Sequence, residues 1–506
     1  MTLLLFLALI AACQGAFAQA PPSATLNLRV TTGGQPTAAR IYITGVDGRK
    51  YQADGAAGYT RGAEVHSVID RSAAIPLPPG RYTVRAEKGA EFRLAEATVN
   101  MVSGKQTELK LEIPRFYDMN GRGWYSGDLH IHRNPDQMPL LARAEHLNIA
   151  PVIGRHVGDG RRVAATFPET NLVAVGGSHF VSLQNQEVER LRKGHGAVVL
   201  LNTAEPVSDE YTDLFPMDLA FCREARKQGG FVDAEKPIWK SVPVNVAFGV
   251  VDSIGVVNNH FHPNGVLLDA EKYGSIERDK PVYHTIAGLA QWIMDLYYSF
   301  LNCGFRIPVS AGSASGVMPS WPGYERVYVQ LSGPFSYEQW FRDLKGGRSI
   351  ATNGPLLEVY MDGKPPGAEM AWEKPTNVKL AIEARSMRKL DRVEIVFNGA
   401  ILRAFSNLDA GEFKQTVDVR ITEAGWLAVR CFEPVTSTIR YAHTSPFYFL
   451  SGGRLPVRRQ EALRWADFIR SLAAATDPAA YPSRQAYEES RAVFRQAEHI
   501  YRDLAL

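Results

Sequence analysis

Two histidines separated by a single residue are the part of this chain best suited to chemistry. His130 and His132 lie in the stretch 123–133, whose aromatic and β-branched residues are typical of a strand. Side chains two residues apart on a strand share a face, so Asp128, His130 and His132 are expected to point the same way. Imidazole is a common ligand of zinc-like ions. The pair therefore predicts a metal site; the alternative is two histidines that are merely packed or solvated.

The distribution of histidine along the chain favours more than one metal ion. Most of the 12 histidines lie between residues 130 and 284. A second pair with the same spacing stands at His260 and His262. With histidine this scarce, two such pairs are not expected by chance, so we predict a multi-metal centre.

Length and composition describe a protein with several globular domains. The chain has 506 residues, 45% of them hydrophobic and 22% charged, which is enough for several full cores. The net charge is only +3, and no basic run with interleaved aromatic residues is present. We therefore expect a small-molecule substrate and no nucleic-acid partner. The sequence leaves the oligomeric state open.

The first 18 residues have the pattern of a signal peptide. An apolar run at 3–12 is followed by small residues at 16–18, ending in Ala-Phe-Ala. The chain is therefore expected to be exported, either to the periplasm or outside the cell. Residues 10–13 resemble a lipobox, so a lipid anchor at Cys13 is the alternative to cleavage after Ala18. No later apolar run is long enough to span a bilayer.

The cysteines do not indicate a disulfide framework. Cleavage after Ala18 leaves Cys222, Cys303 and Cys431, an odd number with wide spacing. We expect them to be buried and to pack as small hydrophobic residues.

Residues 19–117 are expected to form a β-sandwich. Short alternating segments are separated by turns rich in glycine, proline and aspartate, which is typical of this architecture. The predicted strands are 25–30, 40–45, 81–86, 94–102 and 107–113.

Residues 118–355 alternate short apolar strands with stretches compatible with helices. The predicted strands are 149–153, 172–175, 197–201, 230–232 and 250–257, and the predicted helices are 140–147, 218–227 and 286–302. Such alternation predicts a parallel α/β sheet or barrel, in which functional groups lie at the carboxyl ends of the strands. The candidates at those ends are His132, His156, Glu187, His195 and His260.

The C-terminal part returns to β patterning and then becomes helical. Residues 356–452 are expected to form a second sandwich, with strands at 379–384, 392–398, 413–419, 426–431 and 446–450. Asn398 and Gly399 form a strong hairpin signal. Residues 453–506 are expected to pack against the body as a helical hairpin.

Several longer motifs resemble one superfamily. Asp-Leu-His-Ile-His at 128–132 resembles the first motif of the PHP (polymerase and histidinol phosphatase) superfamily of metal-dependent hydrolases. Together with Gly-His at 194–195, Asn-Cys-Gly-Phe at 302–305, Thr-Asn-Gly-Pro at 352–355 and His-Thr-Ser-Pro at 443–446, it resembles the CehA/McbA family. The resemblance covers nearly all of the mature chain. It implies a distorted seven-stranded β/α barrel with two or three metal ions, which hydrolyses ester or carbamate bonds, with phosphoesters as a further possibility.

This chain departs from the family pattern at three places. Ser-Ala-Ser at 313–315 replaces a usual Asp-x-His, Glu-Lys-Pro at 235–237 replaces a His-Pro, and Arg-His at 155–156 replaces an Asp-His. Such a site binds fewer ions, uses Glu235 and His262 as substitutes, or is inactive. In the last case the chain would be a degenerate barrel acting as a secreted or cell-surface binding or scaffold protein.

The site prediction assigns three kinds of role. The predicted metal ligands are His130, His132, His156, Glu187, His195, Glu235 and His260, holding two or three divalent ions per chain, zinc or manganese. A metal-bound hydroxide is expected to be the nucleophile. Asp128 is expected to orient a ligating histidine by accepting its far N–H. Arg155 is a candidate clamp for an anionic substrate, as is Arg133, and a surface salt bridge is the alternative for either.

Three of these ligands have a structural alternative. His156 and His195 would be satisfied core histidines, and Glu187 would lie on a solvated helix face. His146 and His179 are expected to be structural.

Overall fold

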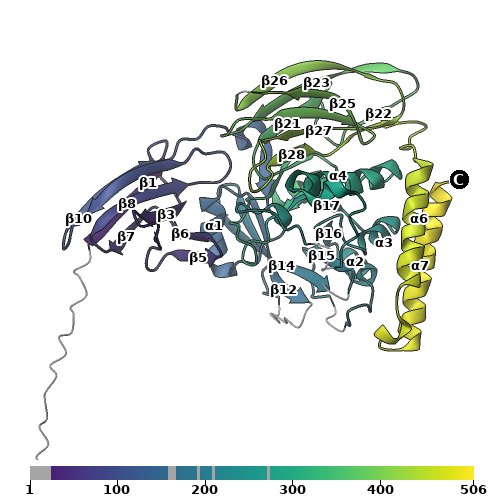
Figure 1. The fold of residues 1–506 in the computed structure, drawn as a ribbon, viewed down its shortest axis with the longest axis horizontal. Helices are drawn as coiled ribbons and strands as arrows, with labels where there is room; N and C mark the ends of the chain where they lie inside the picture. Colours follow the sequence, from purple (N-terminus) through teal and green to yellow (C-terminus); the bar gives the residue numbers. More distant parts are fainter. Residues whose placement is uncertain (1–23, 158–166, 191–193, 208–210, 270–273, 409) are drawn as a thin grey trace, which may run out of the picture.

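The computed structural model describes residues 24–157, 167–190, 194–207, 211–269, 274–408 and 410–506. The predicted signal peptide and Cys13 lie outside these ranges. A β-sandwich lies at one end of the molecule, an α/β region in the middle, a second sandwich over the α/β region, and a helical hairpin at the far end (Figure 1). Within the described ranges, no helix combines the length and apolarity needed to cross a membrane.

The N-terminal sandwich consists of two facing sheets. One has the order β10-β1-β2 with β7 also on β1, and the other has the order β5-β6-β3-β8-β9 with β4 on β3. The strands are β1 (Ala24–Thr32), β2 (Gln35–Pro36), β3 (Ala39–Gly45), β4 (Lys50–Tyr51), β5 (Ala57–Arg61), β6 (Glu64–Ile69), β7 (Ser72–Leu77), β8 (Gly80–Glu87), β9 (Ala95–Met101) and β10 (Gln106–Glu112). Alternate residues such as Leu26 and Leu28 of β1 and Ile41 of β3 form one buried core, as the period-two pattern predicted.

The central region is a mixed α/β layer. Its strands are β11 (Trp124–Gly127), β12 (Ile149–Val157), β13 (Leu172–Gly176), β14 (His179–Arg190), β15 (Gly196–Leu201), β16 (Phe231–Ala234), β17 (Ser253–Asn258), β18 (Val309–Gly312), β19 (Arg326–Gln330) and β20 (Ser349–Thr352). Its helices are α1 (Met138–Ala144), α2 (Asp218–Lys227), α3 (Val242–Ala247), α4 (Ile286–Asn302) and α5 (Tyr337–Lys345). The predicted helices at 218–227 and 286–302 are confirmed.

The central sheet is not the parallel sheet that the alternation predicted. β11, β12 and β14 run parallel, but β14 pairs antiparallel with β15, and β15 pairs antiparallel with β16. Only residues 191–195 separate β14 from β15, and a parallel crossover needs a dozen residues or more. The long strand β14 was missed because the stretch around Glu187 was interpreted as a possible helix.

Strand pairing among the described residues does not close this sheet into a barrel. The sheet runs in the order β18-β17-β16-β15-β14-β12-β11 and continues through β19 and β20. Backbone bonds nevertheless join its far ends: Leu129 N donates to Ala311 O at 3.1 Å, and His132 N donates to Ser315 O at 2.7 Å. The segment after β11 therefore lies between β12 and the end of β18.

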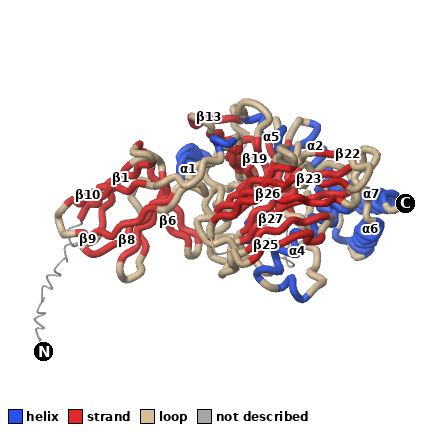
Figure 2. The backbone as a smooth tube through the Cα atoms, turned by 90° about the horizontal axis from the view of Figure 1, so that it is seen from above, coloured by secondary structure: helices blue, strands red, loops and turns tan. Residues whose placement is uncertain are grey.

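The C-terminal sandwich continues from the central sheet. β20 pairs with β28, so no break in pairing marks the predicted boundary at residue 356. Its strands are β21 (Leu356–Met361), β22 (Glu369–Ala371), β23 (Thr376–Arg385), β24 (Arg392–Phe397), β25 (Ala400–Ser406), β26 (Glu412–Ile421), β27 (Gly425–Phe432), β28 (Tyr441–Thr444) and β29 (Phe447–Leu450). The sheet β21-β23-β26 covers the others (Figure 2). Asn398 and Gly399 have φ angles of 51° and 89°, which confirms the predicted hairpin turn.

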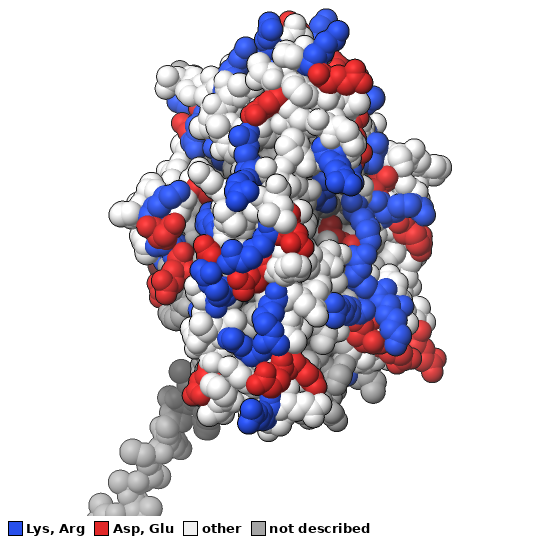
Figure 3. Space-filling model, turned by 90° about the vertical axis from the view of Figure 1, so that its right-hand side faces the viewer, with Lys and Arg blue, Asp and Glu red and all other residues white. Residues whose placement is uncertain are grey.

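The chain ends in the expected helical hairpin, α6 (Arg459–Ala474) and α7 (Arg484–Leu504). Trp465 Nε1 donates to Ser299 Oγ on α4 at 3.0 Å, and Tyr501 donates its hydroxyl to Pro243 O on α3 at 3.0 Å. The face at this end of the molecule carries interspersed acidic and basic side chains (Figure 3). The three described cysteines are buried and free, as expected.

Candidate metal centre

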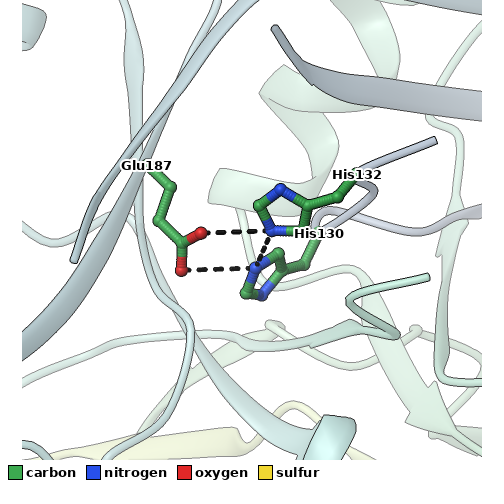
Figure 4. A group of neighbouring side chains, drawn as sticks. All are labelled: His130, His132 and Glu187. Atoms are coloured by element: carbon green, nitrogen blue, oxygen red, sulfur yellow. Dashed lines mark hydrogen bonds and ion pairs between the residues drawn. The ribbon is translucent and has the colours of Figure 1, made fainter. Parts of the chain in front are cut away.

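His130, His132 and Glu187 converge from two neighbouring elements (Figure 4). The Nε2 atoms of His130 and His132 lie 2.9 Å apart. Glu187 on β14 faces both rings, with Oε1 3.3 Å from His130 Nε2 and Oε2 3.1 Å from His132 Nε2. The two-residue spacing thus places both imidazoles on one side, as the sequence predicted.

The two histidines do not lie on the strand itself. β11 ends at Gly127, because the carboxylate of Asp128 accepts the backbone N–H of His130 at 3.1 Å and turns the chain. Gly312 at the end of β18 allows the close approach that follows. A Cβ at that position would lie 2.4 Å from the Cβ of His130, so any larger residue would displace the histidine.

Asp128 has a different role from the one expected. Its carboxylate accepts no imidazole N–H; it accepts the backbone N–H groups of His130, Ser313 and Gly323 and the hydroxyl of Ser313. Burial raises its pKa, although the bonds from Ser313 and Gly323 oppose that rise. Asp128 therefore fixes the loops on either side of the histidines.

Glu235 takes the role predicted for Asp128. Its Oε2 lies 2.7 Å from Nδ1 of His130 and 2.6 Å from Nζ of Lys236, and its Oε1 accepts the indole N–H of Trp239 at 2.8 Å. Burial would raise the pKa of Glu235, but Lys236 and His130 lower it to about 2. Glu235 thus contacts the far nitrogen of a candidate ligand and lies outside the two groups of candidate ligands that converge at Glu187.

A second group of possible ligands shares Glu187. Nε2 of His156 lies 2.7 Å from Oε2 of Glu189 and 3.4 Å from Oε2 of Glu187. Glu187 and Glu189 are two residues apart on β14 and therefore point to the same face. The helix-face alternative for Glu187 is wrong, and a strand interpretation of the same residues would have identified Glu189, which the sequence analysis left out of the site.

His195 and His260 belong to neither group within the described residues. The ring of His195 packs on Phe494 of α7, with centroids 6.0 Å apart. His260 lies in the short helix η3 (Asn259–Phe261) and packs against Trp239 at 6.2 Å. Burial lowers the pKa of each to about 3, helped by Arg190 for His195 and by Lys236 for His260.

Two arginines and two histidines remain among the sequence candidates. Arg155 is half-buried on β12, opposite Gln186 in register. Arg133 is buried, with its guanidinium 4.2 Å from the ring centroid of Tyr59 on β5. His146 and His179 pack against each other at 5.5 Å, away from both groups.

The electrostatics of the group formed by His130, His132 and Glu187 suit a cation. Burial alone would lower the pKa of His130, but the carboxylates of Glu187 and Glu235 outweigh it and raise this pKa to about 10. Burial would raise the pKa of Glu187, but His130 and His132 hold it well below its usual range. A proton on His130 thus supplies positive charge that a divalent ion would supply when bound.

Comparisons with known proteins add little to this geometry. No protein-family model and no curated protein sequence matches the chain. A solved structure, the minor pilin GBS52 of the Gram-positive pathogen Streptococcus agalactiae, is similar to part of it, with 18% identity and a TM-score of 0.16. The match covers 19% of this chain and 46% of the pilin chain. A similarity this weak carries no argument about fold or function.

Proposed function

We propose that this chain is an exported metal-dependent hydrolase, which cleaves an ester, carbamate or related bond at a centre of two divalent ions. The observation that carries the proposal is the convergence of His130 and His132 on Glu187, together with the second group that shares Glu187. Export is inferred from the apolar run at residues 3–12 and the small residues after it.

The donor atoms fit a metal ion. A carboxylate offers only lone pairs, so the 2.7 Å contact with Glu235 places a proton on Nδ1 of His130. In the neutral ring Nε2 then carries the lone pair, and it faces Nε2 of His132 and Glu187. A separation of 2.9 Å between two nitrogens is compatible with one shared ion about 2.0–2.1 Å from each.

Glu187 is the residue through which two ions would be held. It is the member common to both groups, and the donors are imidazoles and carboxylates, which suit zinc and manganese. When bound there, divalent ions would supply Lewis-acid chemistry, which lowers the pKa of a water and polarises a carbonyl or phosphoryl group.

The exposure of the side chains indicates where the substrate approaches. The side chains of His130 and Glu187 are each 4% exposed, whereas that of His156 is 13% exposed and that of Glu189 is 25% exposed. The side chain of His132 is 12% exposed, close to the value for His156, so the most open position of the centre is at Glu189. Glu189 is the carboxylate placed to accept a proton from an incoming water or to donate one to a leaving group.

The backbone supports a PHP-like arrangement as part of the proposal. The bonds from Leu129 to Ala311 and from His132 to Ser315 join the far ends of the series β11, β12, β14, β15, β16, β17 and β18. A ring of these strands would be the distorted barrel that the sequence resemblance implies. The serines that replace the family Asp-x-His are structural here: Ser313 bonds to Asp128, and Ser315 donates to Ser320 O at 2.9 Å.

Metal analysis combined with a substrate panel tests the proposal. The purified chain is loaded with Mn²⁺ or Zn²⁺, desalted and analysed for metal. It is then assayed with 4-nitrophenyl acetate, an aryl N-methylcarbamate and bis(4-nitrophenyl) phosphate. We expect bound metal and hydrolysis of at least one probe, which chelation abolishes and added metal restores. A chain that binds metal substoichiometrically and hydrolyses none of the probes would instead be the binding or scaffold protein.

A further inference from the structure

We infer that the side chain of Lys236 takes the place of a further metal ion in this centre, so that the site holds two divalent ions and not three. This inference rests on the proposed function, because it concerns the same site. It assigns a positioning role to Lys236, which lies in the Glu-Lys-Pro departure at 235–237 and belongs to neither ligand group.

Lys236 is buried in the interior of the centre. It is 3% exposed, its Nζ lies 2.6 Å from Oε2 of Glu235, and it faces the ring of Trp239 at 5.2 Å. An ammonium withdrawn from water is costly unless a charge compensates it. Among the described residues, Glu235 is the carboxylate that forms an ion pair with Lys236. The two side chains therefore form a fixed, neutral pair next to His130.

Lys236 and His130 crowd the oxygen of Glu235 that a metal ion would use. Oε1 accepts the indole N–H of Trp239, and Oε2 faces both His130 Nδ1 and Lys236 Nζ. A metal ion at Glu235 would have to displace at least one of these contacts. It would also meet direct repulsion from the ammonium, which is strong at a few ångströms in a buried site.

His260 and Glu235 are the residues at which Lys236 would prevent a further metal ion from binding. It is 3% exposed, and its Nδ1 has no hydrogen-bond partner within the described residues. Lys236 and Glu235 both act electrostatically on its ring. Trp239 contacts both residues, since it packs against the ring of His260 at 6.2 Å and donates its indole N–H to Glu235 at 2.8 Å. Without the ammonium, the imidazole nitrogen and the carboxylate would be N and O donors of the kind that bind divalent ions.

The Lys236 contact also explains how His130 is oriented. Lys236 and Nδ1 of His130 both contact Oε2 of Glu235, which leaves Nε2 of His130 for the ion shared with His132 and Glu187. Lys236 thus acts on His130 through Glu235.

Counting bound ions in charge-removing variants tests the inference. Lys236→Gln keeps an N–H donor for Glu235 but removes the charge, Lys236→Met removes both, and Lys236→Arg retains the charge. Metal-stripped proteins are titrated with Mn²⁺ by calorimetry, and the content after desalting is measured by mass spectrometry. We expect about two equivalents in the wild type and in Lys236→Arg, and about three in Lys236→Gln and Lys236→Met.

Further variants and outcomes identify the cause of any change. Adding His260→Ala to Lys236→Gln should return the count to two, and circular dichroism checks that each variant is folded. If Lys236→Met does not fold, Lys236→Gln still decides the question, since its amide can keep the hydrogen bond to Glu235. Three bound ions in the wild type, or two in both Lys236→Gln and Lys236→Met, would overturn the inference about Lys236 but not the proposed metal centre. A wild type that binds no Mn²⁺ would overturn the proposed metal centre itself.

Discussion

Nδ1 of His130 lies 2.7 Å from a carboxylate oxygen of Glu235, while Nε2 of the same ring faces Glu187. The imidazole is therefore held between two buried carboxylates, one on each nitrogen. This is the arrangement in which an outer carboxylate fixes the tautomer and orientation of a metal-binding histidine. The relationship separates the two glutamates by role: Glu187 faces the candidate ion and Glu235 orients a ligand.

Replacing Glu235 with Gln should weaken metal binding, and circular dichroism checks that the variant is folded. The amide can still contact His130 but carries no charge, and losing such an outer partner typically costs 10–100-fold in metal affinity. Calorimetric titration with Mn²⁺ measures the effect. Glu358→Gln is the matched control, because Glu358 on β21 of the C-terminal sandwich is similarly buried and pairs with Arg122. Equal Mn²⁺ affinity in Glu235→Gln and wild type would count against the orienting role.

Glu187 and Glu189 should differ in the number of ions that they control. Glu187 belongs to both ligand groups and Glu189 to one. Glu187→Gln is expected to lose both ions, and Glu189→Gln to keep about one, held by His130, His132 and Glu187. Metal content after desalting measures this directly. The shared-ligand arrangement fails if Glu187→Gln keeps one ion while Glu189→Gln loses both.

The fold was predictable where a local pattern decides the structure. Helix α4 matches the predicted 286–302, because a long apolar run follows Thr285, whose hydroxyl caps the helix by accepting the N–H of Gly288 at 3.0 Å. The turn at Asn398 and Gly399 is equally local. The direction of β15 could not be predicted locally, because it depends on how β15 pairs across the sheet and on the short connection after β14, which is too short for a parallel crossover.

The site was predictable in its histidine pair and not in the partners of that pair. The spacing of His130 and His132 fixes a common face, but nothing in the sequence shows that Glu235, which follows β16, contacts Nδ1 of His130. Glu189 was missed because its neighbourhood was interpreted as a helix, in which residues two apart do not share a face. His195 was included because a parallel sheet was assumed.

The N-terminal sandwich should influence metal affinity through Tyr59. Its hydroxyl donates to Met318 O and accepts the N–H of Gly316 at 3.2 Å. These residues belong to the loop whose Ser315 carbonyl accepts the backbone N–H of His132. Tyr59→Phe removes this link between the domains, so we expect a loss of about 0.5–1.5 kcal/mol in the free energy of unfolding and weaker Mn²⁺ binding.

A second tyrosine provides the control for Tyr59. Tyr82 donates its hydroxyl to Pro78 O at 2.9 Å, within the sandwich itself. Tyr82→Phe should therefore change thermal stability and leave the Mn²⁺ affinity unchanged. If both variants bind Mn²⁺ as tightly as the wild type, the sandwich has no effect on the centre.

The metal-free protein should lose stability as the pH rises. The carboxylates around His130 raise its pKa to about 10 in the folded state, against about 6.5 in an unfolded chain. The proton therefore stabilises the fold fully below about pH 6.5, and this contribution disappears as the pH rises towards 10. Urea unfolding of the stripped protein at pH 6 and pH 9 measures the difference.

His130→Gln, which carries no titratable proton, is the control for this pH dependence and should show a smaller difference between the two pH values. Since a metal ion must displace the same proton, Mn²⁺ affinity should also increase with pH over this range. An equal loss of stability in His130→Gln would assign the effect to other groups.

The measurement that tests the central claim most directly is the metal content and hydrolytic activity of the His130→Ala, His132→Ala double variant, compared with the wild type before and after chelation. Removing both imidazoles should abolish bound metal and hydrolysis together. Circular dichroism should show that both sandwiches remain folded, because their buried cores do not include these histidines. Full hydrolysis by the double variant after exhaustive chelation would contradict the claim and place the chemistry elsewhere.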